Sequence, residues 1–309
     1  MGAIDHVVVS GGTGLIGRAL VKRHIADGTR CTVLSRRQDA SLPAGARLAV
    51  WNAKTPGPWT RALDGATAVV HLAGENLASG RWTAARKRRL WNSRVDSTRL
   101  LAEVIRSADA PPPVYVQSSG VSYYGPRAVG EEVDEDAGPG DDFLSRLAIA
   151  WEEASRPLAE AGVRRVLLRT SPVLALDGGA LPRMLTPFRL GLGAVLGDGR
   201  QAFPWIHLHD QVEAIRFLLA DPAAAGPFNL AAPESVDNRE FSKALARTLH
   251  RPCWFRVPGP MLRLLLGELA DSLLRGQHVR PRRLTELGFE FRYPRLEPAL
   301  RSLLGVGER

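Results

Sequence analysis

Cysteine is scarce in this chain, and several common motifs are missing. The two cysteines, Cys31 and Cys253, are too few for a disulfide framework or a four-ligand zinc site, so we expect a reducing, cytoplasmic setting. No stretch approaches 18 uninterrupted apolar residues, and no basic segment followed by an apolar one opens the chain, so neither a membrane span nor a signal peptide is expected. The absence of Gly-x-Ser-x-Gly excludes the nucleophile elbow of α/β-hydrolases.

Lysine is also scarce, although the chain is basic. Only Lys22, Lys54, Lys87 and Lys243 occur among 41 basic residues, which face 32 acidic ones and give a net charge of +9. Such a balance is compatible with phosphate-bearing ligands but does not identify one. With 309 residues, 45% of them hydrophobic, the chain is long enough for two globular units, or for one large unit with an appendage.

Short apolar runs alternate with helical patterns through the first 175 residues. Strand-like runs cover 6–10, 31–35, 66–72, 114–117 and 166–168, and helical patterns cover 15–26, 92–107 and 143–161. This alternation predicts an α/β fold, a Rossmann doubly wound parallel sheet with helices on both faces. We assign residues 1–175 to this domain and 176–309 to a smaller α+β substrate cap, with the chain near 205–235 returning to the first domain.

A glycine-rich turn follows the first predicted strand. Gly11, Gly14 and Gly17 lie three residues apart, after an apolar strand and before an amphipathic helix. Gly11 would permit the tight turn, Gly14 would let backbone N–H groups approach a pyrophosphate, and Gly17 would bring helix and strand together. A glycine triplet can also form a simple turn, but the strand before it and the helix after it favour a dinucleotide loop. Its contacts would come from Gly11, Thr13, Gly14, Leu15, Ile16 and Gly17.

The second predicted strand ends in Ser35-Arg36-Arg37. An NAD-selective site would place an acid there for the ribose hydroxyls, whereas a hydroxyl and guanidinium groups suit the 2′-phosphate of NADP. Two arginines can also belong to a solvated loop, but their position about 20 residues beyond the glycines favours a role at the cofactor. The sequence therefore predicts NADP(H).

Further motifs give the chain a family resemblance. Leu72-Ala73-Gly74, Ser118-Ser119, Tyr124-Gly125 and Trp205-Ile206-His207 resemble the extended short-chain dehydrogenase/reductases, and more narrowly the atypical branch called the NAD-dependent epimerase family. The resemblance implies an NADP(H)-binding oxidoreductase or nucleotide-sugar epimerase-like protein whose cap covers a small-molecule substrate. It also implies cofactor contacts from Leu72, Ala73, Gly74, Arg94 and Ser118. An arginine at position 94 could meet the pyrophosphate or an anionic substrate, or could be a surface residue of a basic helix.

The proton-transfer pair of that superfamily is missing. Four residues after each tyrosine stand a serine, an arginine, an alanine and a glutamate, so no Tyr-x-x-x-Lys exists. The remaining catalytic candidates are Ser119 and Tyr124, with Tyr123 beside them, although tyrosines beside a Gly-Pro turn more often pack and form hydrogen bonds. Two hypotheses remain: an enzyme with unusual acid–base residues, or a catalytically silent NADP(H) sensor.

Two other clusters have simpler interpretations. His207 and His209 are spaced like metal ligands on a strand, but without a third ligand we expect no metal and expect Asp210 to cap a helix. The basic run 86–89 could contact nucleic acid, but without interleaved aromatics a solvated helix face is favoured.

Overall fold

A parallel sheet of seven strands forms the centre of the computed structural model, which describes residues 4–306. Its spatial order is β11-β7-β5-β4-β1-β2-β3, and every neighbouring pair is parallel. The chain builds outward from β1 to β3 and then reverses at β4, so a crevice opens between the carboxyl ends of β1 and β4. The strands are β1 His6–Ser10, β2 Arg30–Ser35, β3 Arg47–Val50, β4 Ala68–His71, β5 Val114–Gly120, β7 Arg164–Thr170 and β11 Gly226–Leu230.

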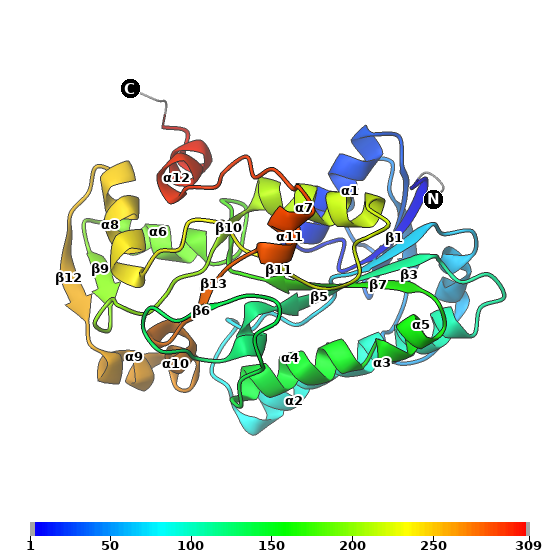
Figure 1. Cartoon of the computed structure of the whole chain (residues 1–309), viewed down its shortest axis with the longest axis horizontal. Coiled ribbons are helices and arrows are strands. Elements are labelled where there is room, and N and C mark those ends of the chain that lie inside the picture. Colours follow the sequence, from blue (N-terminus) through cyan, green and yellow to red (C-terminus); the bar gives the residue numbers. More distant parts are fainter. Residues whose placement is uncertain (1–3, 307–309) are drawn as a thin grey trace.

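Helices cover both faces of this sheet (Figure 1). Alternate strand residues such as Val7 and Val9 pack on one face with α1 (Leu15–Ala26), α7 (Leu208–Ala220) and α11 (Arg282–Glu286). Val8 faces the other side and packs toward α3 (Val95–Arg106) and α5 (Arg156–Glu160). The layer on that side also contains α2 (Ala84–Asn92) and α4 (Phe143–Glu153). The predicted doubly wound α/β fold is confirmed.

Much of the chain beyond residue 175 packs as a smaller α+β region around its own core. That core includes Leu185, Trp205, Phe241 and Leu300, all buried. Its elements are α6 Leu181–Arg189, β9 Gly193–Leu196, α8 Asn238–Thr248, β12 Cys253–Val257, α9 Gly259–Leu266, α10 Leu269–Leu274 and α12 Leu296–Leu304. Short parallel pairs join β8 (Val173–Leu174) to β10 (Ile206–His207) and β6 (Glu132–Val133) to β13 (His278–Val279). Short 3-10 helices form η1 Pro58–Leu63 and η2 Val121–Tyr124.

One predicted helix is divided in the structure, and a glycine separates two further helices. The pattern over 143–161 becomes α4 and α5, because Pro157 cannot donate into a continuing helix and begins α5 instead. A second break falls at Gly267, where a φ of +63° ends α9 before α10 begins. None of the described helices is both long and apolar enough to cross a bilayer.

Candidate dinucleotide and catalytic site

The glycine loop joins β1 to α1 beside the crevice at the carboxyl edge. Gly11 has a φ of +73°, and a Cβ there would lie 2.7 Å from the carbonyl carbon of Leu72. A Cβ on Gly17 would lie 2.3 Å from the Gly11 carbonyl oxygen, so glycine alone allows the helix to start this close to the strand. The N–H of Gly14 donates to that oxygen at 2.9 Å and closes the turn.

The N-terminus of α1 is open to an anion. Gly14 is exposed and precedes the helix without a side-chain cap, and the first turn contains no acidic residue. The first N–H groups of a helix lack partners and carry the positive end of its dipole. This end of α1 can therefore take the phosphates that the sequence predicted for Thr13, Gly14, Leu15 and Ile16.

The predicted 2′-phosphate residues follow β2 at the same edge. Ser35 is buried, and its Oγ accepts the N–H of Arg37 at 3.2 Å, which shapes the turn after the strand. Arg36 and Arg37 are exposed, and neither forms an ion pair within residues 4–306. Two guanidinium groups thus remain available to a ligand, and their contact with a 2′-phosphate stays a prediction.

The loop after β4 contacts the glycine loop on one side and Arg94 on the other. Leu72 and Ala73 pack against Gly11 across the crevice, and Gly74 is exposed. Arg94 is 8% exposed, so it is not the surface arginine that was one of the two alternatives. It donates to the Glu75 carbonyl at 3.0 Å, and burial lowers its pKa to about 10. Its contact with the cofactor stays a prediction.

A buried ion pair contacts the catalytic candidates Ser119 on β5 and Tyr124 on η2. Arg169 on β7 binds both carboxylate oxygens of Glu152 on α4, at 3.0 and 2.9 Å, and both side chains are buried. Burial lowers the pKa of Arg169, but the hydrogen bonds and charge of Glu152 raise it by more, so the pKa lies above its ordinary value. Ser119 Oγ donates to the same carboxylate at 2.7 Å, whereas Ser118 is half-buried at the strand end.

Tyr124 belongs to the same network. It is fully buried, its hydroxyl donates to Asn229 Oδ1 at 2.6 Å, and it accepts a hydrogen bond from Arg169 at 3.1 Å. Burial raises its pKa to about 12, with the charge of Arg169 offsetting only part of the effect. The neighbouring Tyr123 is half-buried and stacks its ring on the Arg169 guanidinium, 3.5 Å from ring centre to Cζ.

The expected cap at Asp210 is wrong. His207 precedes α7 and accepts the N–H of His209 on Nδ1 at 3.0 Å, so the histidine is the cap. Asp210 is buried and accepts the N–H groups of Arg292 and Tyr293, each at 2.9 Å, which ties the C-terminal segment to α7. Within residues 4–306 no group of three metal-binding side chains comes together.

The basic run 86–89 on α2 is less solvated than its sequence suggested. Arg86 is 5% exposed, pairs with Glu75 and donates to the Asn76 carbonyl. Lys87 pairs at 2.6 Å with Glu268 in the cap. Arg89 also lies 3.6 Å from Glu75, so three of these four charges form ion pairs within the chain. The expectation that nucleic acid does not bind here stays a prediction.

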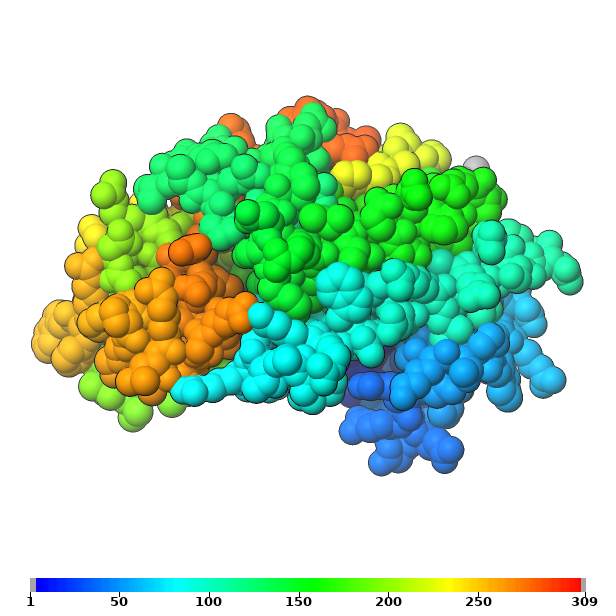
Figure 2. Space-filling model, turned by 90° about the horizontal axis from the view of Figure 1, so that it is seen from below, coloured from blue at the N-terminus to red at the C-terminus, as the bar shows by residue number. Residues whose placement is uncertain are grey.

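Cap residues reach across to the first domain near this helix. Arg81 donates to the carbonyls of Leu264 and Leu265 at the end of α9, and Arg183 donates to the Ala78 carbonyl at 2.9 Å. Figure 2 shows α9 and α10, in orange, lying directly against this cyan part of the chain. The cap is therefore attached to the loop that follows β4.

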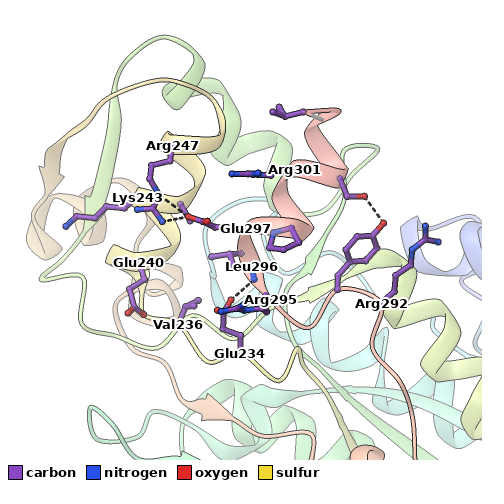
Figure 3. Close-up of a pocket in the computed structure, with 15 residues that line it drawn as sticks. Glu234, Val236, Glu240, Lys243, Arg247, Arg292, Arg295, Leu296, Glu297 and Arg301 are labelled. Carbon is purple, nitrogen blue, oxygen red and sulfur yellow. Dashed lines mark hydrogen bonds and ion pairs between the residues drawn. The ribbon is translucent and has the colours of Figure 1, made fainter. Parts of the chain in front are cut away.

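A large cavity of about 810 Å³ lies away from the sheet, between α8 and α12 (Figure 3). Arg247 pairs with Glu297 across it, and Glu234 accepts the N–H of Leu296 at 2.5 Å. Its lining contains neither the glycine loop nor the carboxyl end of any strand of the main sheet. The features expected of a dinucleotide site are therefore those of the crevice between β1 and β4.

Comparison with known proteins identifies the family. The sequence profile of the NAD dependent epimerase/dehydratase family matches residues 7–231, and a domain of unknown function, DUF1731, matches residues 257–303. The chain belongs to the NAD dependent epimerase/dehydratase family. The epimerase family protein SDR39U1 of Bos taurus is 39% identical over 303 residues, which are 96% of this chain and 99% of that protein.

Two solved structures agree with this family. The human SDR39U1 structure with NADPH has a TM-score of 0.87 and 36% identity, covering 97% of this chain and 99% of that one. A nucleoside-diphosphate sugar epimerase from Corynebacterium glutamicum has a TM-score of 0.80 and 30% identity, covering 98% of this chain and 59% of that one. These matches confirm the family resemblance and the class of cofactor predicted from the sequence.

Sequence reasoning did not anticipate Glu152 and Arg169. They lie 17 residues apart on a helix and a strand, and no local sequence pattern indicates that the two side chains meet. The one available signal is the position of Arg169 directly after the apolar run 166–168 of β7, because a charge in a buried strand requires a partner.

Proposed function

We propose that this protein binds NADP(H) in the crevice between β1 and β4 and does not catalyse hydride transfer by the proton route usual for the superfamily. The open N-terminus of α1 supports the pyrophosphate position. Arg36 and Arg37, with no acid at the end of β2, support NADP(H) over NAD(H). The NADPH in the human relative supports the same choice.

The residues of the glycine loop suit the phosphates of such a dinucleotide. Gly14 is exposed at the open end of α1, and the glycines at 11 and 17 let the loop pack closely against Leu72 and the start of the helix. When bound, a nicotinamide dinucleotide supplies or accepts a hydride. The chain's part is to bind the phosphates through backbone N–H groups and to read the 2′-phosphate through the arginines after β2.

One observation supports a binding role over turnover. Both candidate donors, Ser119 and Tyr124, are buried and already bonded within the Glu152–Arg169 network. A reduced carbonyl would need a proton on its oxygen, and a phenol whose pKa is raised to about 12 is a poor acid at neutral pH. We therefore infer a redox-sensing or regulatory NADP(H)-binding protein in a cytoplasmic setting.

Calorimetry with NADPH and NADH, followed by a panel of carbonyl and nucleotide-sugar substrates, tests this proposal. We expect saturable NADPH binding, weaker NADH binding, and no turnover in wild type or Tyr124→Phe. Arg36→Glu should lose the preference for NADPH. Turnover that disappears in Tyr124→Phe would overturn the sensing role, and equal affinities in wild type and Arg36→Glu would overturn the arginine assignment.

A second candidate function is an oxidoreductase that uses Tyr123. Its hydroxyl forms no hydrogen bond with the described residues, its side chain is half-buried, and a guanidinium lies on its ring. Such an enzyme would lose turnover in Tyr123→Phe while NADPH binding stays the same. Tyr124→Phe is the matched control, because it removes a hydroxyl one residue away that is committed to the buried network.

A further inference from the structure

A cationic cavity extends the predicted 2′-phosphate site beyond the end of β2. It measures about 570 Å³ and lies beside the ends of β2 and β3. Arg36 and Lys54 both line it, and no carboxylate does; the other lining residues are Val50, Trp51, Asn52, Thr55, Pro56, Gly57, Pro58 and Trp59. Its size is within the range of small-molecule pockets, and its charge suits an anion.

Strand register brings the two cations to the same edge. Ser35 pairs with Val50 at the ends of β2 and β3, and the N–H of Trp51 donates to the Ser35 carbonyl at 3.1 Å. Arg36 therefore leaves the sheet next to the segment that leads to Lys54. Neither cation forms an ion pair within the described part of the chain.

A rigid turn fixes the backbone of Lys54. Asn52 Oδ1 accepts the N–H groups of Lys54 and Thr55 at 2.8 and 2.9 Å, and Asn52 Nδ2 donates to Thr55 Oγ1 at 2.7 Å. Ala53 between them has a φ of +58°, which this turn requires. Trp59 Nε1 donates to the Thr55 carbonyl at 3.1 Å, so the turn is held from both sides.

We propose that Lys54 is a second cation for the 2′-phosphate of NADP(H), facing Arg36 across this cavity. The inference rests on the NADP(H) binding proposed above. A phosphate monoester carries between one and two negative charges near pH 7, and Arg36 is the one of the two arginines that lines this cavity, so a phosphate there would carry more charge than Arg36 alone neutralises. Lys54 would supply a compact point charge beside the planar group of Arg36, and it would act on NADP(H) but not on NAD(H).

Calorimetry of Lys54→Gln with NADP⁺ and NAD⁺ tests the proposal directly. We expect NADP⁺ to bind about fivefold more weakly, the effect of one exposed charge–charge contact, and NAD⁺ to change by less than about twofold. Lys54→Arg should restore most of the NADP⁺ affinity. The NADP⁺ difference between wild type and Lys54→Gln should also shrink as KCl is raised, because salt screens exposed charges.

Lys22→Gln is the matched control, because Lys22 is exposed on α1, forms no ion pair within residues 4–306, and loses the same charge. Binding of adenosine 2′-monophosphate and of adenosine 5′-monophosphate shows which phosphate Lys54 contacts. The affinity for the 2′-monophosphate alone should weaken in Lys54→Gln. Equal results for Lys54→Gln and Lys22→Gln, or equal weakening of both monophosphates, would overturn this role. A wild-type protein that binds no NADP⁺ would instead overturn the proposed function.

Discussion

Removing the Glu152 carboxylate should destabilise the fold by about 3–5 kcal/mol, the usual cost of leaving one member of a buried ion pair without its partner. The side chains of Arg169 and Glu152 are 5% and 8% exposed, so water cannot replace the lost contacts. In Glu152→Ala the guanidinium loses hydrogen bonds of 3.0 and 2.9 Å, and the Ser119 hydroxyl loses its acceptor at 2.7 Å. The decrease in the free energy of unfolding should therefore lie in the upper part of that range.

Urea unfolding followed by circular dichroism measures this difference, with an exposed ion pair of the same chain as the control. The side chains of Arg247 and Glu297 are 63% and 47% exposed, so Glu297→Ala should cost at most about 1 kcal/mol. Replacing both buried partners, as in Glu152→Met with Arg169→Met, should recover stability relative to Glu152→Ala, because no unpaired charge remains. A loss in Glu152→Ala no larger than in Glu297→Ala would refute the reasoning.

Three further predictions follow from single contacts. Gly17→Ala should lower the melting temperature, because its Cβ would meet the Gly11 carbonyl oxygen at 2.3 Å; Gly14→Ala, with 3.3 Å to the same oxygen, should fold and lose only NADPH affinity in calorimetry. Arg81→Ala should speed hydrogen exchange in α9 and α10, since it removes donors to the end of α9, and unchanged exchange would contradict the attachment of the cap there. Burial lowers the pKa of His71 from 6.5 to about 3, so the folded protein holds it neutral; stability is complete above pH 6.5 and should fall by about 1.4 kcal/mol per pH unit for this group as pH drops toward 3. Urea unfolding should show a free energy of unfolding about 2 kcal/mol lower at pH 5 than at pH 7 through this group, and His71→Gln should reduce that difference.

The sequence indicates features whose cause is local and misses those that depend on distant partners. The glycine loop and the order of strands and helices follow from spacing over a few residues, and both are confirmed in outline. Asp210 was misassigned because a carboxylate at a helix start commonly caps it, whereas its partners here are backbone groups 82 and 83 residues later. Arg86 was read as solvated because a run of like charges usually is, yet its partner Glu75 lies outside the helix.

Lys54 shows the same limit at the candidate site. It is one lysine in a polar loop, and only the register of β2 with β3 places that loop beside Arg36. Pairing register depends on the whole sheet and cannot be read from the short motif itself. The sequence could therefore predict one side of a phosphate site while leaving the other side unnamed.

The residues proposed for dinucleotide binding and those considered for proton transfer lie on different elements of the fold. The glycine loop, Arg36 and the loop at Leu72 follow β1, β2 and β4, whereas the candidate donors and their ion pair lie on β5, η2, β7 and α4. Backbone amides and exposed arginines bind phosphates without help from a catalytic tyrosine. A chain can thus lose the tyrosine–lysine pair and bury a salt bridge below β5 while the phosphate-binding half of the same edge stays intact. That separation is why the fold can support a sensor of NADP(H) as well as an enzyme that consumes it.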